Sequence, residues 1–277
     1  AMNSYFQTVW NGINFLTFIL LVALLTWPMA SPYDSSSVFD PQPTPSLAHP
    51  LGTDVYGSDI LIQLATATSI NVKYALSALF PFLIFGVSFG LILGYSSNDS
   101  SNVDGQNNGL SVVLNLAVKI VTELFQSIPA ALVVVFGILV VNNAISNPGV
   151  RIYLVMVTYG FACIPGLVYS IRDEVSRLRK EEFIQASKAL GVSRTRLIVV
   201  DILWYSCGHI IFSKTVNMFL AAIAIEIFAS FYMSSSVLTL GTLIENSFYQ
   251  FRATILVCMI FFSMRWFSEK ITFEMDG

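Results

Sequence analysis

The stretch "YALSALFPFLIFGVSFGLILGY", residues Tyr74 to Tyr95, decides the fold class, because it is almost entirely apolar and contains no Asp, Glu, Lys or Arg. A helix rises about 1.5 Å per residue, so about 20 such residues cover a hydrocarbon core of about 30 Å. The stretch therefore predicts a membrane-spanning helix. The composition agrees, since 55% of the 277 residues are hydrophobic and only 11% are charged, whereas soluble domains carry about 25% charged residues.

Five further stretches have similar length and polarity, so we expect an all-α integral membrane protein with six transmembrane helices. These five expected spans are residues 13–30, 112–141, 150–171, 209–231 and 254–273. The stretch 112–141 carries Lys119, Glu123 and Pro129, so it is interpreted as an interfacial turn followed by a spanning helix. Arg265 interrupts the last stretch.

The distribution of charge predicts the orientation of the chain. Seven of the fourteen Lys and Arg residues lie between Arg172 and Arg196, and an excess of positive charge marks cytoplasmic loops. Residues 31–71 contain no Lys or Arg but four Asp, as expected of an exported loop. With six spans, the amino and carboxyl termini then both lie in the cytoplasm.

The positively charged segment contains "EEFIQASKALG", residues Glu181 to Gly191, which predicts a short amphipathic helix. Its apolar stripe has spacings of three and four and consists of Phe183, Ala186 and Leu190, with Ile184 and Ala189 adjacent. Glu182 joins Glu181 in the first turn, where carboxylates complement the helix dipole, and Gly191 is expected to close the helix in a left-handed conformation. By periodicity alone this is a surface helix packed on the membrane face; the sharper interpretation is a rigid cytoplasmic docking element.

The expected external loop contains "HPLGTDVYGSDIL", residues His49 to Leu61. Gly52 and Gly57 supply turn geometry. Asp54 and Asp59 are expected to cap the entrance of a helix that starts near Ile60, and contact with a partner or substrate is the alternative.

Charges inside the spans are costly and are therefore expected to face a bundle interior or a water-filled cavity. Glu226, in the middle of the fifth span, is the clearest case, either protonated or paired. Lys119 and Glu123 are four residues apart on one helix and are expected to pair.

We do not expect this chain to catalyse a covalent reaction by itself. The sequence has no GxxxxGK[ST], HExxH or CxxC pattern, and His49 and His209 each stand without neighbouring ligand candidates, so we expect no catalytic residue, cofactor or metal site. Energy for any transport must then come from an ion gradient or from a partner.

Four stretches, taken together and in order, resemble the permease C subunits of dipeptide and oligopeptide (Dpp/Opp/Sap-type) ABC transporters. "EFIQASKALG" resembles the EAA loop of importer permeases, with Gln185 in place of glutamate and Ser187 in place of the second alanine. "HPLGTDVYGSDIL" resembles the family's "HPLGTDxxGRDVLSRL", in which Thr53 falls in the GTD motif and Ser58 replaces an arginine. "ELFQSIPAAL" resembles "DILLAFPSLL", and "AIAIEIFASF" resembles "GGAILAEASLSF".

The resemblance implies the fold of a type I ABC importer permease in the bacterial inner membrane. Residues 1–30 would form the amino-terminal segment and first transmembrane helix, 31–70 a periplasmic loop with the GTD motif, and 71–277 the permease core. The family's coupling helix would correspond to residues 181–191, and the ATPase contacts would be Glu181, Glu182, Phe183, Gln185, Ala186, Leu190 and Gly191. Glu123 and Glu226 are candidates for the translocation pathway.

The partners that the resemblance implies are a second, B-type permease and two ATPases, which would carry ATP and Mg. A periplasmic or lipid-anchored solute-binding protein would deliver peptides or related small solutes; membrane lipid would surround the chain, and no nucleic acid is expected. A secondary ion-coupled transporter and a degenerate permease acting as a scaffold or sensor remain as alternatives.

Overall fold

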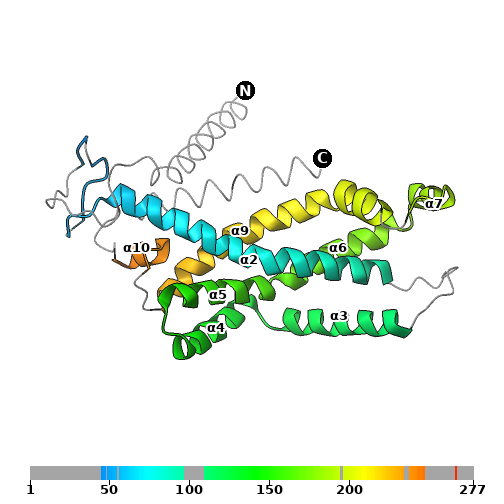
Figure 1. Cartoon of the computed structure of the whole chain (residues 1–277), viewed down its shortest axis with the longest axis horizontal. Coiled ribbons are helices and arrows are strands. Elements are labelled where there is room, and N and C mark those ends of the chain that lie inside the picture. Colours follow the sequence, from blue (N-terminus) through cyan, green and yellow to red (C-terminus); the bar gives the residue numbers. More distant parts are fainter. Residues whose placement is uncertain are drawn as a thin grey trace, which may run out of the picture. The chain divides into compact units, whose positions relative to one another are not determined.

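The computed structural model describes residues 45–47, 49–54, 56–96, 109–193, 196–233, 237–246 and 266. Nearly all of them are helical (Figure 1). The helices are α2 (Ile60–Ser96), α3 (Gly109–Ser127), α4 (Ala130–Ala144), α5 (Pro148–Ala162), α6 (Ile164–Leu178), α7 (Glu182–Ala189), the π-helix η1 (Leu197–Ser206), α9 (Gly208–Ser230) and α10 (Leu240–Asn246). Among the described residues, β-structure is limited to isolated bridge positions at Thr53, Ser58 and Asp59, of which Thr53 pairs with Asp59.

Three described helical stretches are long and apolar enough to cross a membrane, namely Ile60–Gly94, Pro148–Leu178 and Gly208–Ser230. These stretches correspond in order to the expected second, fourth and fifth spans. The first and third of them end one residue before the expected span does. Ile60 also begins the helix that was expected to start near it, so the end of the predicted 31–70 loop segment belongs to α2. The expected first span, and all of the sixth except Trp266, lie outside the described residues.

The interfacial turn and spanning helix expected within residues 112–141 are two helices, and the first of them, α3, is a helix of 19 residues instead of a turn. Leu116–Ser127 and Ala130–Ala144 are bent by 85° relative to each other. The bend lies at Ile128 and Pro129, where proline supplies no backbone donor and clashes with a preceding helical turn. The pair is therefore either one broken span or a re-entrant loop; counted as a span, it brings the described part of the chain to four.

By density of contacts the chain divides into two compact units. The first comprises Ala1–Leu76, Gly137–Met156 and Phe219–Gly277, and the second comprises Ser77–Phe136 and Val157–Met218. The described part of the expected external loop, residues 45–47, 49–54 and 56–59, falls in the first unit. The segment expected to be cytoplasmic, with α7, falls in the second.

Close helix packing builds the second unit. Gly86, Gly90 and Gly94 of α2 follow one another at intervals of four and therefore lie on one helix face. A Cβ atom at these positions would lie 2.6 to 2.7 Å from a side-chain carbon of α6. The α6 residues concerned are Leu167, Ile171 and Val175. Small residues at such spacing let two helix backbones approach closely.

α3 adds to this core by packing on α6. Leu93, Val118 and Val168 form a buried cluster together with Ile164. In the second unit α2 and α3 thus both pack on α6, the helix that precedes α7 in the chain.

Candidate functional site

The predicted short helix of the cytoplasmic segment is present as α7, and among its side chains whose burial is described only that of Ile184 is buried. Ile184 is 0% exposed, whereas Phe183 is 48% and Leu190 84% exposed. Glu182 and Ala186 are also exposed. The stripe residues Phe183, Ala186 and Leu190 are therefore exposed, whereas the adjacent Ile184 is buried and anchors the helix.

The turn after α7 has the predicted conformation. Gly191 has φ +77°, in the left-handed region that favours glycine. The amide N–H of Val192 donates to the Ser187 carbonyl over 3.2 Å, and the amide N–H of Leu190 donates to the Ala186 carbonyl over 3.0 Å. These bonds satisfy carbonyls that the end of a helix would otherwise leave unpaired.

Ionic contacts and backbone bonds join α6 to α7. The guanidinium of Arg177 donates to both carboxylate oxygens of Glu174, over 3.0 and 2.6 Å, and to Glu181 over 3.5 Å. The amide N–H of Glu181 donates to the Leu178 carbonyl, and that of Ile184 donates to the Glu181 carbonyl. The residues between α6 and α7 thus form hydrogen-bonded turns.

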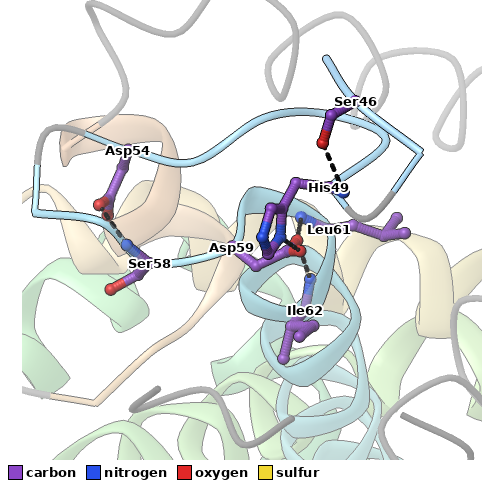
Figure 2. Close-up of polar contacts among 7 residues, drawn as sticks. All are labelled: Ser46, His49, Asp54, Ser58, Asp59, Leu61 and Ile62. Atoms are coloured by element: carbon purple, nitrogen blue, oxygen red, sulfur yellow. Dashed lines mark hydrogen bonds and ion pairs between the residues drawn. The ribbon is translucent and has the colours of Figure 1, made fainter. Parts of the chain in front are cut away.

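The GTD loop is built as the sequence predicts, by two capping aspartates (Figure 2). Asp54 Oδ1 accepts the amide N–H group of Tyr56 over 2.9 Å and that of Ser58 over 2.8 Å, the second of which is drawn in Figure 2. Asp59 Oδ1 accepts those of Leu61 and Ile62 over 2.8 and 3.3 Å, at the first turn of α2. The capping role of both residues is confirmed.

Two glycines shape the same loop. Gly52 and Gly57 both have φ +82°, a conformation that costs residues with a Cβ atom roughly 1 kcal/mol or more. The amide N–H of Ile60 donates to the Gly52 carbonyl over 3.2 Å, and that of Asp54 to the Ser58 carbonyl over 2.9 Å. Thr53 is buried at 3% exposure. The loop is therefore folded back on the start of α2.

His49 belongs to this loop structure, which the sequence did not predict. Its Nδ1 lies 2.7 Å from Asp59 Oδ2, and both residues are buried (Figure 2). The backbone N–H of His49 is accepted by Ser46 Oγ over 3.0 Å. The expectation that His49 stands without a neighbouring ligand candidate is wrong, because the turns at Gly52 and Gly57 bring His49 and Asp59 together. The spacing of these residues in "HPLGTDVYGSD" was the one feature of the sequence that could have indicated the pair.

Glu226 is fully buried, at 0% exposure, as predicted for a charge within a span. It lies four residues before the end of α9 and not in the middle of the helix. Asn71 Nδ2 and Ser230 Oγ donate to its two carboxylate oxygens, the second over 2.7 Å. Thr239 and the backbone N–H of Gly241 also hydrogen-bond it. These four partners are neutral donors.

Lys119 and Glu123 pair as predicted, with 3.8 Å between Nζ and Oε1. Their side chains are 61% and 54% exposed, whereas Val118 and Thr122 on the same helix are buried. α3 thus exposes one ion pair together with large apolar side chains, among them Leu116, Ile120 and Leu124, on the side away from its buried residues. Glu123 belongs to the second unit and Glu226 to the first.

The sequence matches the family of binding-protein-dependent transport system inner membrane components over residues 86–266. It is 26% identical to the dipeptide transport system permease protein DppC of Alkalihalophilus pseudofirmus, over 74% of this chain and 61% of that protein. It is 25% identical to the oligopeptide transport system permease protein OppC of Bacillus subtilis, over 79% of this chain and 65% of that protein. It is 27% identical to the nickel transport system permease protein NikC of Escherichia coli K12, over 72% and 65%. The matched part of the chain thus spans less than two thirds of the length of each of these three relatives.

Proposed function

The chain belongs to the family of binding-protein-dependent transport system inner membrane components, and from this premise we propose that it is a pore-forming permease subunit of an ATP-driven ABC transporter. It pairs with a second permease and binds two ATPases, and it crosses the bacterial inner membrane six times with both termini in the cytoplasm. Relatives named for dipeptide and oligopeptide transport favour peptides or related small solutes as cargo. The chain itself hydrolyses no ATP.

The observation that carries this proposal is the exposed apolar side of α7. Phe183 and Leu190 are among the exposed large hydrophobic side chains of the chain, while Ile184 and the left-handed Gly191 hold the helix in place. Exposed apolar groups on a rigid short helix favour a protein contact, because burying them there removes them from water at little cost in ordering. α7 is the ATPase contact in this proposal.

The exposed ion pair of Lys119 and Glu123 on α3 supports a water-filled pathway. A charge that faces lipid near the middle of a span costs about 2.5 to 3.5 kcal/mol on insertion scales. Lys119 and Glu123 are more than half exposed, so in the assembled transporter their face meets water or the second permease and not lipid. Glu123 is therefore retained as a pathway residue.

The test is affinity purification of the tagged chain from its own membrane, with identification of the proteins that accompany it. We expect two P-loop ATPases and a second permease with the unmodified chain, and loss of the ATPases but not of the permease with Phe183→Asp. Leu47→Asp, at an exposed apolar residue of the external loop, is the matched control and retains all partners.

Three results would count against the proposal. ATPases that remain bound to Phe183→Asp refute the α7 contact. A complex that binds ATPases yet never couples solute to ATP turnover is a scaffold or sensor. Transport that survives ATP depletion and stops when the ion gradient collapses identifies a secondary transporter.

A further inference from the structure

The start of α10 is held by side chains from two other helices of the same compact unit. The amide N–H of Leu240, the first residue of α10, donates to Asn71 Oδ1 of α2 over 3.1 Å. The N–H of Gly241 hydrogen-bonds the carboxylate of Glu226 in α9. Asn71 also donates to Glu226, so the two capping side chains bind each other.

The third N–H group is capped locally. The N–H of Thr242 donates to Thr239 Oγ1 over 3.3 Å, and the N–H of Thr239 donates to Thr242 Oγ1 over 2.8 Å. This is the reciprocal arrangement of a capping box, with threonine in place of glutamate or glutamine. The first three N–H groups of α10 therefore all have partners, and two of these come from outside the helix.

Shape as well as hydrogen bonding fixes the contact. A Cβ atom at Gly241 would lie 2.4 Å from the Cβ of Ser230 and 3.0 Å from the Cα of Ile227. The start of α10 thus lies directly against the last turn of α9, with room only for glycine. Asn71, Glu226, Ser230 and Thr239 are each at most 2% exposed, so water does not compete for these bonds.

From this geometry we infer that Asn71 and Glu226 form a clasp that positions α10, so that Glu226 is a positioning residue for α10 and not a group that meets the transported solute. A carboxylate suits the position, because it accepts several N–H and O–H donors and lies at the positive end of the α10 dipole. A pathway carboxylate would need exposure to water, whereas this one has none. The inference revises the pathway role of Glu226 and leaves that of Glu123 in place; it does not depend on ATP coupling.

The test follows the mobility of α10 with a nitroxide spin label on Glu245→Cys, an exposed position of α10, in the chain purified with its partners in nanodiscs. Glu226→Gln keeps the size of the side chain but leaves one acceptor oxygen for the four donors, so α10 should loosen. We expect the label's rotational correlation time to shorten about threefold or more. Gly241→Ala should do the same by steric displacement.

Two controls separate the clasp from general destabilisation. A label on Tyr153→Cys, an exposed residue of α5 in the same unit, should keep its mobility in every variant. The exchange Asn71→Asp with Glu226→Gln keeps an acceptor for Leu240 and restores a donor–acceptor pair between positions 71 and 226, so it should recover most of the native Glu245→Cys spectrum.

An unchanged label in Glu226→Gln overturns the inference, as does loosening at both label sites or an exchange variant as mobile as Glu226→Gln. Failure to recover ATPases with the native chain would refute the proposed function instead, and the label result would stand independently of it.

Discussion

At the scale of single residues, several contacts join groups that lie within four positions of each other along the chain. Asp54 and Asp59 cap turns within four residues of themselves, and Lys119 reaches Glu123 one helical turn away. Gly191 adopts its left-handed conformation next to the helix it ends. Local rules suffice for such contacts because the partners are fixed by sequence spacing.

Asp59 allows a stability prediction at this scale. Asp59→Ala removes the cap of α2 and leaves the ring of His49 buried without its carboxylate, so we expect a loss of about 1 to 3 kcal/mol. His49→Ala removes only one of the interactions of Asp59 and should cost less. Thermal unfolding of the purified variants in detergent measures both, and an Asp59→Ala variant as stable as the native chain would falsify the capping role.

The residue contacts that escaped prediction join distant parts of the sequence. Asn71 and Glu226 are 155 positions apart and contact each other, and no periodicity within α2 or α9 identifies such a partner. The His49 pair spans only ten residues, yet it too depends on how the intervening turns fold. Burial of Glu226 could be predicted from the cost of charge in a span, but its capping role could not.

At the scale of elements, the packing of α2 on α6 depends on the glycine face of α2. The spacing of Gly86, Gly90 and Gly94 is visible in the sequence, but the helix that they meet is not. The predicted apolar side of α7 is present; Ile184 is its buried residue, and Phe183, Ala186 and Leu190 are exposed. A stripe shows that a helix has an apolar side; it does not show whether the same chain or a partner covers it.

Gly90→Ala tests the packing of the two helices. Its Cβ would lie 2.7 Å from the Cβ of Ile171, so α2 and α6 must separate, and we expect a loss of about 1 to 3 kcal/mol. Gly166→Ala in α6 is the matched control, because a Cβ there meets nothing within 4 Å and alanine favours a helix by about 1 kcal/mol.

The two variants should therefore shift the midpoint of thermal unfolding in opposite directions. Equal shifts would show that the effect belongs to glycine replacement in general and not to the α2 and α6 contact. Gly90→Ala combined with Ile171→Ala should regain part of the stability, since the smaller side chain makes room for the new methyl group.

At the scale of the whole molecule, composition and charge predicted a helical membrane protein, because both depend on averages over many residues, and four short stretches in order indicated its family. The number of crossings is a different matter, since it depends on whether α3 and α4 form one broken span or a re-entrant loop. α4 has 15 residues and, at about 1.5 Å per residue, covers about 22 Å, short of the roughly 30 Å hydrocarbon core. Sequence hydropathy placed α3 and α4 in one stretch, in which Pro129 indicated a break, but the length of α3 and the 85° angle of the bend could not be predicted.

The sidedness of two exposed residues decides between these topologies. Tyr56 in the GTD loop and Leu190 after α7 are 78% and 84% exposed, and the expected second, third and fourth spans separate them. Three crossings put the two residues on opposite sides of the membrane, whereas a re-entrant α3 and α4 leaves two crossings and puts them on the same side. We expect a membrane-impermeant maleimide to label Tyr56→Cys in intact cells, and Leu190→Cys only after the cells are opened, above the background of the native cysteines. Labelling of both from outside, or of both only after opening, would establish the re-entrant form and would also move α7 relative to the face that carries the GTD loop.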